Sequence, residues 1–248
     1  MSDWGDNRQA ALAQFQVGVD NVIFSVDSSH NRLLVLLVKR VDPPQKGAWG
    51  LPGTFVRAGE SLEDSAYRVL SEKIEVKNLY LEQLYSFGDR ILETSSQALG
   101  HGNRQRYLSV SYFALVRYED VTLMGQEQDL AAWFPVDLQE NMAVTLAFNH
   151  LEILQYGHMR LQNKVTYSPV AFDVLPSQFT LNDLYQFYCT ILGTEFADYS
   201  NFRSRLLKLG FLLDTGQKVS RGAGRPAALY EFDPRAFLPF QDKPLVFV

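Results

Sequence analysis

The chain of 248 residues has one cysteine, Cys189, and therefore cannot form a disulfide bond within itself. Cysteine scarcity is typical of proteins that work in a reducing compartment, so we expect a cytoplasmic protein. The chain also lacks any run approaching the roughly 20 apolar residues that a membrane span needs. Its first residues, MSDWGDNRQ, are acidic and polar, and we expect no secretory signal there. These features argue against a disulfide scaffold and a membrane protein.

Histidine is scarce too, and its four positions do not have the spacing of metal ligands. They are His30, His101, His150 and His158. We predict no metal site and no required cofactor. His150 falls in a helical stretch, and we expect it to be packed and hydrogen-bonded rather than catalytic.

Positive charge is also in short supply overall, with a net charge of −5, but it is unevenly distributed. Residues 1–175 hold 15 Lys and Arg against 21 Asp and Glu, a net charge of −6. Residues 198–226 hold six basic and two acidic residues, a net charge of +4. A local basic patch on an acidic protein is typical of a regulator with one DNA-contacting face.

Apolar residues make up 46% of the chain, enough for two folded domains. Residues 16–40 read as two strands around a turn, a Pro- and Gly-rich loop follows, and a helix is expected from Ser61. Residues 107–118 read as a further strand, and a helix is expected from about 143 to 160. This order predicts an α/β (α+β) mixed sheet with helices over residues 1–165, followed by a linker at 166–178.

Residues 179–248 follow a different pattern. Thr180 and Asp183 form a capping-box arrangement at the start of one helix, which Gly193 ends. A second helix is expected from Asp198 to Leu209, with Gly210 as its stop, and two strand-like runs flank the basic loop QKVSRGAGRP. Helix, turn, helix and hairpin in this order predict a winged helix-turn-helix domain.

The second helix divides into two faces on a helical wheel. Phe202, Leu206 and Leu209 form an apolar stripe, and polar and basic residues occupy the other side. Arg can pair with guanine, Asn with adenine, and Lys and Ser with phosphates, so this helix is a candidate major-groove reader. The predicted DNA-binding residues are Thr180, Ser200, Asn201, Arg203, Ser204, Arg205 and Lys208, with Lys218, Arg221 and Arg225 in the basic loop.

Residues 51–76 resemble the Nudix box, with Thr54 at its first Gly position and Glu60 and Arg68 matching. Three signature positions differ: Val69 and Lys73 stand where glutamates are expected, and Glu75 stands where a glycine is expected. Carboxylates at i, i+3 and i+4 of a helix can hold divalent cations that position an attacking water. Only Glu72 remains of those three, so we predict no hydrolysis.

A Nudix-like domain followed by a winged helix resembles the Nudix-related transcriptional regulators of NAD metabolism, the NrtR family. The resemblance rests on LPGTFV (51–56), WFPV (133–136), LAFNHLEIL (146–154), YSPVAFDVLP (167–176), FTLNDL (179–184), NFRSRL (201–206) and GRPAALYEF (224–232). It implies a homodimeric repressor of NAD biosynthesis or salvage genes that ADP-ribose releases from a palindromic operator. It also implies DNA contacts from Asn201, Arg203, Arg205 and Arg225. One family stretch keeps only Arg104 within His101-Gly102-Asn103-Arg104.

A domain that does not hydrolyse a nucleotide can still bind one. We hypothesise that Lys73 partly replaces the missing metal charge against a pyrophosphate, so that Lys73→Glu weakens nucleotide affinity without metal. The predicted effector-binding residues are Arg40, Trp49, Thr54, Arg57, Glu60, Arg68, Glu72, Lys73, Arg104 and Arg106.

Three alternatives stay open. The chain could be an active ADP-ribose pyrophosphatase fused to a nucleic-acid-binding module, against which Val69 and Lys73 argue. Its Nudix part could serve only as a dimerisation scaffold. Its winged helix could instead contact another protein, and salt-insensitive association would indicate that case.

Overall fold

The computed structural model describes residues 15–76, 79–93, 104–124, 131–136, 144–193, 198–220, 225–241 and 243–245, without the side chains of 89–93 and 104–105. The N-terminal half is built on a mixed sheet in the order β3-β2-β1-β7-β6, with β4 added to β1 and β9 to β2. The strands are β1 (Phe15–Asp27), β2 (Arg32–Lys39), β3 (Trp49–Gly50), β4 (Gly53–Phe55), β6 (Glu82–Glu93), β7 (Arg104–Arg117) and β9 (Ala131–Pro135). Strands β1 and β7 are parallel and the other pairs antiparallel, which confirms the expected mixed sheet.

Strand β1 changes partner along its length. Its first half pairs with β4, from Gly18 opposite Phe55 to Asp20 opposite Gly53, and its second half pairs with β2. Between the two, the buried Asn21 donates from its backbone N and its Nδ2 to the carbonyl of Pro52, at 2.9 and 3.2 Å. The sheet therefore forks at Asn21, and the loop that leads into β4 is held at the fork.

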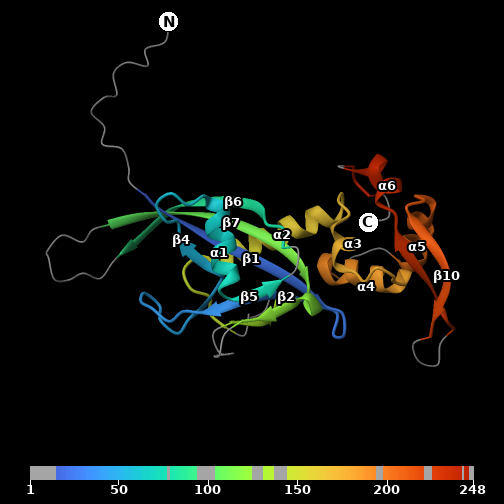
Figure 1. The fold of residues 1–248 in the computed structure, drawn as a ribbon, viewed down its shortest axis with the longest axis horizontal. Coiled ribbons are helices and arrows are strands. Elements are labelled where there is room, and N and C mark those ends of the chain that lie inside the picture. The colour runs from blue at the N-terminus through green and yellow to red at the C-terminus, as the bar shows by residue number, and fades with distance from the viewer. Residues whose placement is uncertain are drawn as a thin grey trace, which may run out of the picture.

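Helices cover both faces of this sheet (Figure 1). Helix α1 (Leu62–Ser71) packs with Val19, Ile23 and Leu36 in one core, and helix α2 (His150–Val165) packs against the opposite face with Val22 and Phe24. Ser61 caps α1, since its Oγ accepts from the backbone N of Asp64 at 3.0 Å. A short ribbon of β5 (Ile74–Val76) and β8 (Val121–Leu123) extends this half, with the 3₁₀ turn η1 (Tyr118–Asp120) before β8.

The expected helix at about 143–160 is displaced toward the C-terminus, and it runs from His150 to Val165. Phe148 has a positive φ of 51°, a conformation that cannot continue a right-handed helix. Leu146 bridges to Trp49, and Ala147 donates its backbone N to the Trp49 carbonyl at 2.8 Å. The residues before His150 are thus used to tie the helix start to β3.

The C-terminal half is a winged helix-turn-helix, as the sequence predicts. Its elements are α3 (Val170–Val174), α4 (Leu181–Leu192), α5 (Tyr199–Lys208), β10 (Leu212–Val219), β11 (Ala227–Phe232), α6 (Pro234–Phe237) and the 3₁₀ turn η3 (Leu238–Phe240). The capping box at Thr180 and Asp183 is present in both directions, at 3.1 and 2.9 Å. Gly193 and Gly210 end their helices with φ of 89° and 75°.

The two halves share one hydrophobic core. A single cluster of buried side chains runs from Val22 and Phe24 of β1 through α2 to Leu184 of α4 and Phe202 of α5. Residues 166–178, interpreted above as a linker, contain α3, whose Phe172 stacks on Phe232 of β11 with ring centroids 4.1 Å apart. Leu245 also returns to this junction and donates its backbone N to Thr166 at 2.7 Å. None of the helices in the described residues has the length and apolar character that crossing a membrane requires.

Candidate functional site

Helix α5 separates a buried face from an exposed polar one. Phe202 and Leu206 are fully buried, and Phe202 packs against Tyr185 and Tyr188 of α4 with ring centroids 5.3 and 6.0 Å apart. Asp198 caps the helix by accepting from the backbone N of Asn201 at 3.0 Å. The exposed residues of α5 include Ser200, Asn201, Arg203, Ser204, Arg205 and Lys208, as the helical wheel predicts.

The wing is the hairpin of β10 and β11, in which Lys218 pairs with Ala228. Lys218 is exposed near the tip of β10, and Arg225 is exposed just before β11. Arg221 lies outside the described residues. The structure thus brings two basic residues of the predicted loop into one hairpin that follows the candidate reading helix.

Thr180 does not belong with these residues. Its side chain is 4% exposed, and its Oγ1 accepts from the backbone N of Asp183, so it caps α4 instead of facing solvent. The prediction of Thr180 as a DNA contact is therefore corrected to a structural role, because a buried and engaged hydroxyl cannot reach a phosphate.

Glu60 and Arg68, the two matching residues of the Nudix-like box, bind one another. Arg68 donates from Nε and Nη2 to the two Glu60 carboxylate oxygens at 2.6 and 3.0 Å, and from Nη2 to the Phe55 carbonyl at 3.2 Å. These hydrogen bonds lower the pKa of the Glu60 carboxyl to about 2. Glu60 also accepts from the backbone N of Arg57 at 3.1 Å. The pair pins the loop after β4 to α1.

The altered positions of the box do not fit a divalent metal. Val69 is 5% exposed and belongs to the core beneath α1, so its side chain faces the protein interior. Helix α1 ends at Ser71, Glu72 is its exposed C-cap, and Lys73 lies in the turn beyond. Within the described residues no group of three or more His, Cys, Asp or Glu side chains is placed to hold a metal ion. One carboxylate beside a lysine is a poor ligand set for a hard cation.

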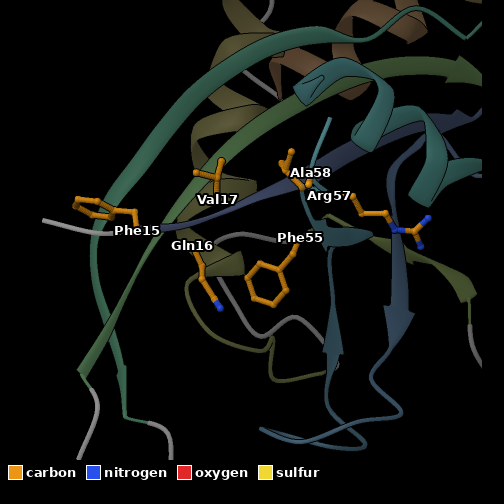
Figure 2. Close-up of a pocket in the computed structure, with 7 residues that line it drawn as sticks. Phe15, Gln16, Val17, Phe55, Arg57 and Ala58 are labelled. Atoms are coloured by element: carbon orange, nitrogen blue, oxygen red, sulfur yellow. The ribbon is translucent and has the colours of Figure 1, made fainter. Parts of the chain in front are cut away.

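An open pocket of about 450 Å³ lies where β1 begins and β4 ends (Figure 2). Phe55 and Gln16 point to one side of β1 in that view, and Val17 and Ala58 to the other. Phe55 is 54% exposed, and its ring lies 5.6 Å from that of Tyr107 on β7. The lining residues are Phe15, Gln16, Val17, Phe55, Val56, Arg57 and Ala58.

The predicted effector-binding residues divide into those at this pocket and those away from it. Arg57 lines it, Thr54 lies in the adjoining β4, and the guanidinium of Arg106 stacks over the Phe15 ring, 4.4 Å from the ring centroid. Arg40 instead lies over Phe148 at 4.6 Å, and Trp49 packs edge-on against Phe134 at 4.7 Å. The Arg104 side chain lies outside the described residues.

His150 is 6% exposed and hydrogen-bonded, which confirms the expectation of a packed residue. Its Nδ1 accepts from the backbone N of Leu51 at 2.8 Å, and its Nε2 lies 3.5 Å from Asp20 Oδ1. The other Asp20 oxygen accepts from Ser109 Oγ at 2.5 Å. A Cβ on Gly50 would meet His150 Nδ1 at 2.7 Å, so glycine is required for this close approach. The start of α2 is thereby tied to the loop that leads into β4.

Sequence reasoning missed Phe15, Phe55, Asp20 and Ser109. Phe55 lies inside the quoted LPGTFV segment, and an aromatic residue beside a glycine-rich loop is the feature that could have drawn attention to it. The other three gain their positions from strand pairing between β1, β4 and β7.

Comparison with known proteins agrees with this architecture. The NUDIX domain family model matches residues 15–156, and the model of the AraR C-terminal winged HTH domain matches residues 167–248. The chain is therefore a Nudix domain joined to a winged helix-turn-helix. It is 34% identical over 236 residues to the ADPR responsive transcriptional repressor NtrR of Acinetobacter baylyi, covering 91% of this chain and 88% of the relative. The chain belongs to this NrtR family of Nudix-related repressors.

Solved structures show the same relationship. The NrtR protein of Shewanella oneidensis, crystallised with a 27mer DNA, is 35% identical with a TM-score of 0.69, covering 89% of this chain and 94% of that one. A MutT/nudix family protein from Enterococcus faecalis is 25% identical with a TM-score of 0.67, covering 92% and 90%.

Proposed function

We propose that this chain is an ADP-ribose-responsive transcriptional repressor of NAD biosynthesis or salvage genes. The observation that carries the proposal is α5, which buries Phe202 and Leu206 against α4 and exposes Asn, Ser, Arg and Lys side chains beside a basic wing. That division is what major-groove binding requires. A relative of 35% identity was crystallised with DNA, and another is named as an ADPR responsive repressor.

The effector is proposed to bind at the pocket of β1 and β4. Arg57 lines the pocket and Arg106 adjoins it through Phe15, so two guanidinium groups are available to a pyrophosphate. The exposed ring of Phe55, backed by Tyr107, offers a surface on which a nucleobase can stack. Cations and aromatic rings in one open pocket suit an anionic nucleotide such as ADP-ribose, and the contribution of Lys73 remains a separate hypothesis.

The Nudix domain is proposed to sense its ligand without hydrolysing it. Metal-assisted attack on a pyrophosphate needs cation ligands on α1, and the buried Val69 and the basic Lys73 do not supply them. Glu60, a retained acidic residue of the box, is bound by Arg68. An active pyrophosphatase remains the competing function, and the experiment below includes its assay.

Helix α2 is proposed to link the effector pocket to the DNA reader. Its first residue, His150, holds Leu51 in the loop before β4, and Gln162 in its last turns donates to the Ile191 carbonyl of α4 at 3.1 Å. In a homodimer, displacing α2 would change the separation of two winged helices that must meet half-sites about 34–36 Å apart, or a multiple of that distance. The homodimer, the palindromic operator and the domain boundaries are part of this proposal.

The test is binding of the full chain to promoter fragments of NAD-metabolism genes at fixed salt, with and without ADP-ribose. We expect ADP-ribose to weaken operator binding by roughly 5- to 150-fold, and DNA to weaken ADP-ribose binding by the same factor. Arg57→Ala should reduce the response to ADP-ribose while leaving operator binding intact. Lys46→Ala, at an exposed position that does not line the pocket, is the matched control.

The same samples are assayed for ADP-ribose hydrolysis with magnesium. Rapid hydrolysis with weak, salt-labile DNA binding would establish the enzyme instead. Operator binding that saturating ADP-ribose leaves unchanged would favour the scaffold function of the Nudix domain. Salt-insensitive association without preference for any operator would indicate a protein partner.

A further inference from the structure

The exposed face of α5 carries one aliphatic side chain that packing does not explain. Leu207 is 38% exposed, whereas the neighbouring Phe202 and Leu206 are fully buried against α4. A leucine one position after a buried one lies about 100° further around a helix, and here that places it toward solvent. The fold of the winged helix therefore does not account for Leu207.

Leu207 shares its face with the proposed DNA contacts. A shallow hollow along α5 is lined by Tyr199, Ser200, Arg203, Ser204 and Leu207. Residues 200, 203, 204 and 207 have the i, i+3, i+4, i+7 spacing that forms one stripe of a helix. The stripe begins beside Tyr199, which Tyr185 holds edge-on at a centroid distance of 5.1 Å. Leu207 therefore offers one apolar group, within a polar stripe, to whatever this face of α5 meets.

The charges around Leu207 indicate which partner the stripe meets. Arg203 lies one turn before Leu207 on this stripe and Lys208 is the next residue, and no acidic residue lies within α5, because Asp198 is the N-cap that precedes it. This charge is complementary to a phosphate backbone. In the major groove the apolar group on a base edge is the C5-methyl of thymine, because the other base edges present hydrogen-bond donors and acceptors.

We propose that Leu207 contacts the C5-methyl group of a thymine in each operator half-site and so determines specificity at that base pair. The proposal rests on the DNA-binding function proposed above and adds a base to it. Arg203, one helical turn earlier on the same stripe, is placed to hold the register through a guanine or a phosphate. Leu207 then distinguishes thymine from cytosine, which lacks the methyl group.

The experiment removes the methyl group from the DNA and the side chain from the protein. An operator is first selected from a random duplex library with the full-length chain, and each of its thymines is then replaced by deoxyuridine. Dissociation constants at fixed salt are measured for the wild type and for Leu207→Ala. We expect one thymine position per half-site where the replacement weakens wild-type binding about fourfold, the effect of burying one methyl-sized group.

Leu207→Ala should bind the operator equally well with thymine or with deoxyuridine at that position. Its affinity for both should be no higher than the affinity of the wild type for the deoxyuridine operator. Alanine favours helix and the site is exposed, so the variant should fold normally. Leu238→Ala, at a position in η3 that is 63% exposed and lies outside α5 and the wing, is the matched control and should keep the full effect. Thymine replacement that costs both proteins the same at every position would overturn the proposal.

Two further outcomes separate this inference from the function on which it rests. A Leu207→Ala variant that loses affinity by the same factor for the thymine and the uracil operator would overturn the thymine contact and leave the DNA-binding function standing. If no operator is enriched by the wild-type chain, the DNA-binding function itself fails, and the contact with it.

Discussion

Glu60 matches the Nudix-like box, and in this structure it stabilises the fold by binding Arg68. A carboxyl whose pKa is lowered to about 2 in the folded chain contributes stability above its ordinary pKa of 4.5. That contribution is lost as the pH falls from about 4.5 through about 2. We expect Glu60→Gln, which keeps the shape but not the charge, to unfold more easily at neutral pH and to lose less stability on acidification.

The measurement is urea unfolding of the wild type and Glu60→Gln between pH 7 and the acid limit of the fold. The two stability curves should converge as the pH falls. The control is Glu63→Gln, which makes the same substitution at an exposed position on the same helix. Its stability curve should run parallel to that of the wild type. Curves for Glu60→Gln that also stay parallel would contradict the assigned role of the Arg68 pair.

Val69 makes a second prediction at this scale. Its side chain lies in the core beneath α1, so a glutamate there must bury a carboxyl group without a partner. We expect Val69→Glu to lower the free energy of unfolding by roughly 2–4 kcal/mol. Lys73→Glu, at a half-buried turn position, should change it by less than about 1 kcal/mol. Equal effects in urea unfolding would show that Val69 is not a core residue.

Helix α2 makes a prediction at the scale of the element. A Cβ on the buried Gly157 would lie 3.2 Å from Val22 Cγ1, so the helix approaches β1 closely at that point. We expect Gly157→Val to overpack this contact and cost roughly 1–3 kcal/mol. Gln155→Val puts the same β-branched residue at an exposed position of α2 and should cost no more than about 0.7 kcal/mol. If both variants lose the same stability in thermal unfolding, the helix propensity of valine, and not overpacking against Val22, accounts for both losses.

The helices that the sequence predicted correctly are those whose caps and apolar stripes are formed by residues close together in the chain. Helix α4 has its capping box within four residues, and α5 has its apolar stripe within ten. The strands β4 and β9 were not predicted, because each is short and exists only by pairing with a strand distant in the chain, and the two-residue β3 is too short to show a pattern. The start of α2 was misplaced because contacts with Trp49 and the positive φ of Phe148 override its helical pattern.

The whole molecule is predicted to unfold as one unit, since one buried cluster joins the Nudix sheet, α2 and the winged helix. No tryptophan follows Trp133 in the chain, so tryptophan fluorescence carries no signal from within the winged helix. Helical circular dichroism reports on both halves, because its main contributions come from α1, α2, α4 and α5. We expect the two urea transitions to coincide. A separate, later transition in either probe would show that the halves are independently stable.

The sequence by itself determined the class of fold, the two faces of α5 and the presence of Val69 and Lys73 where the Nudix-like box has glutamates. These features depend on helical periodicity, on caps and on residue type, which are properties of neighbouring residues. Only the tertiary structure decided that Thr180 is buried, that Phe55 and Phe15 meet at one pocket, and that Leu207 is left exposed. Those outcomes depend on which distant elements pack together, because burial removes a side chain from solvent only when a partner from elsewhere in the chain covers it.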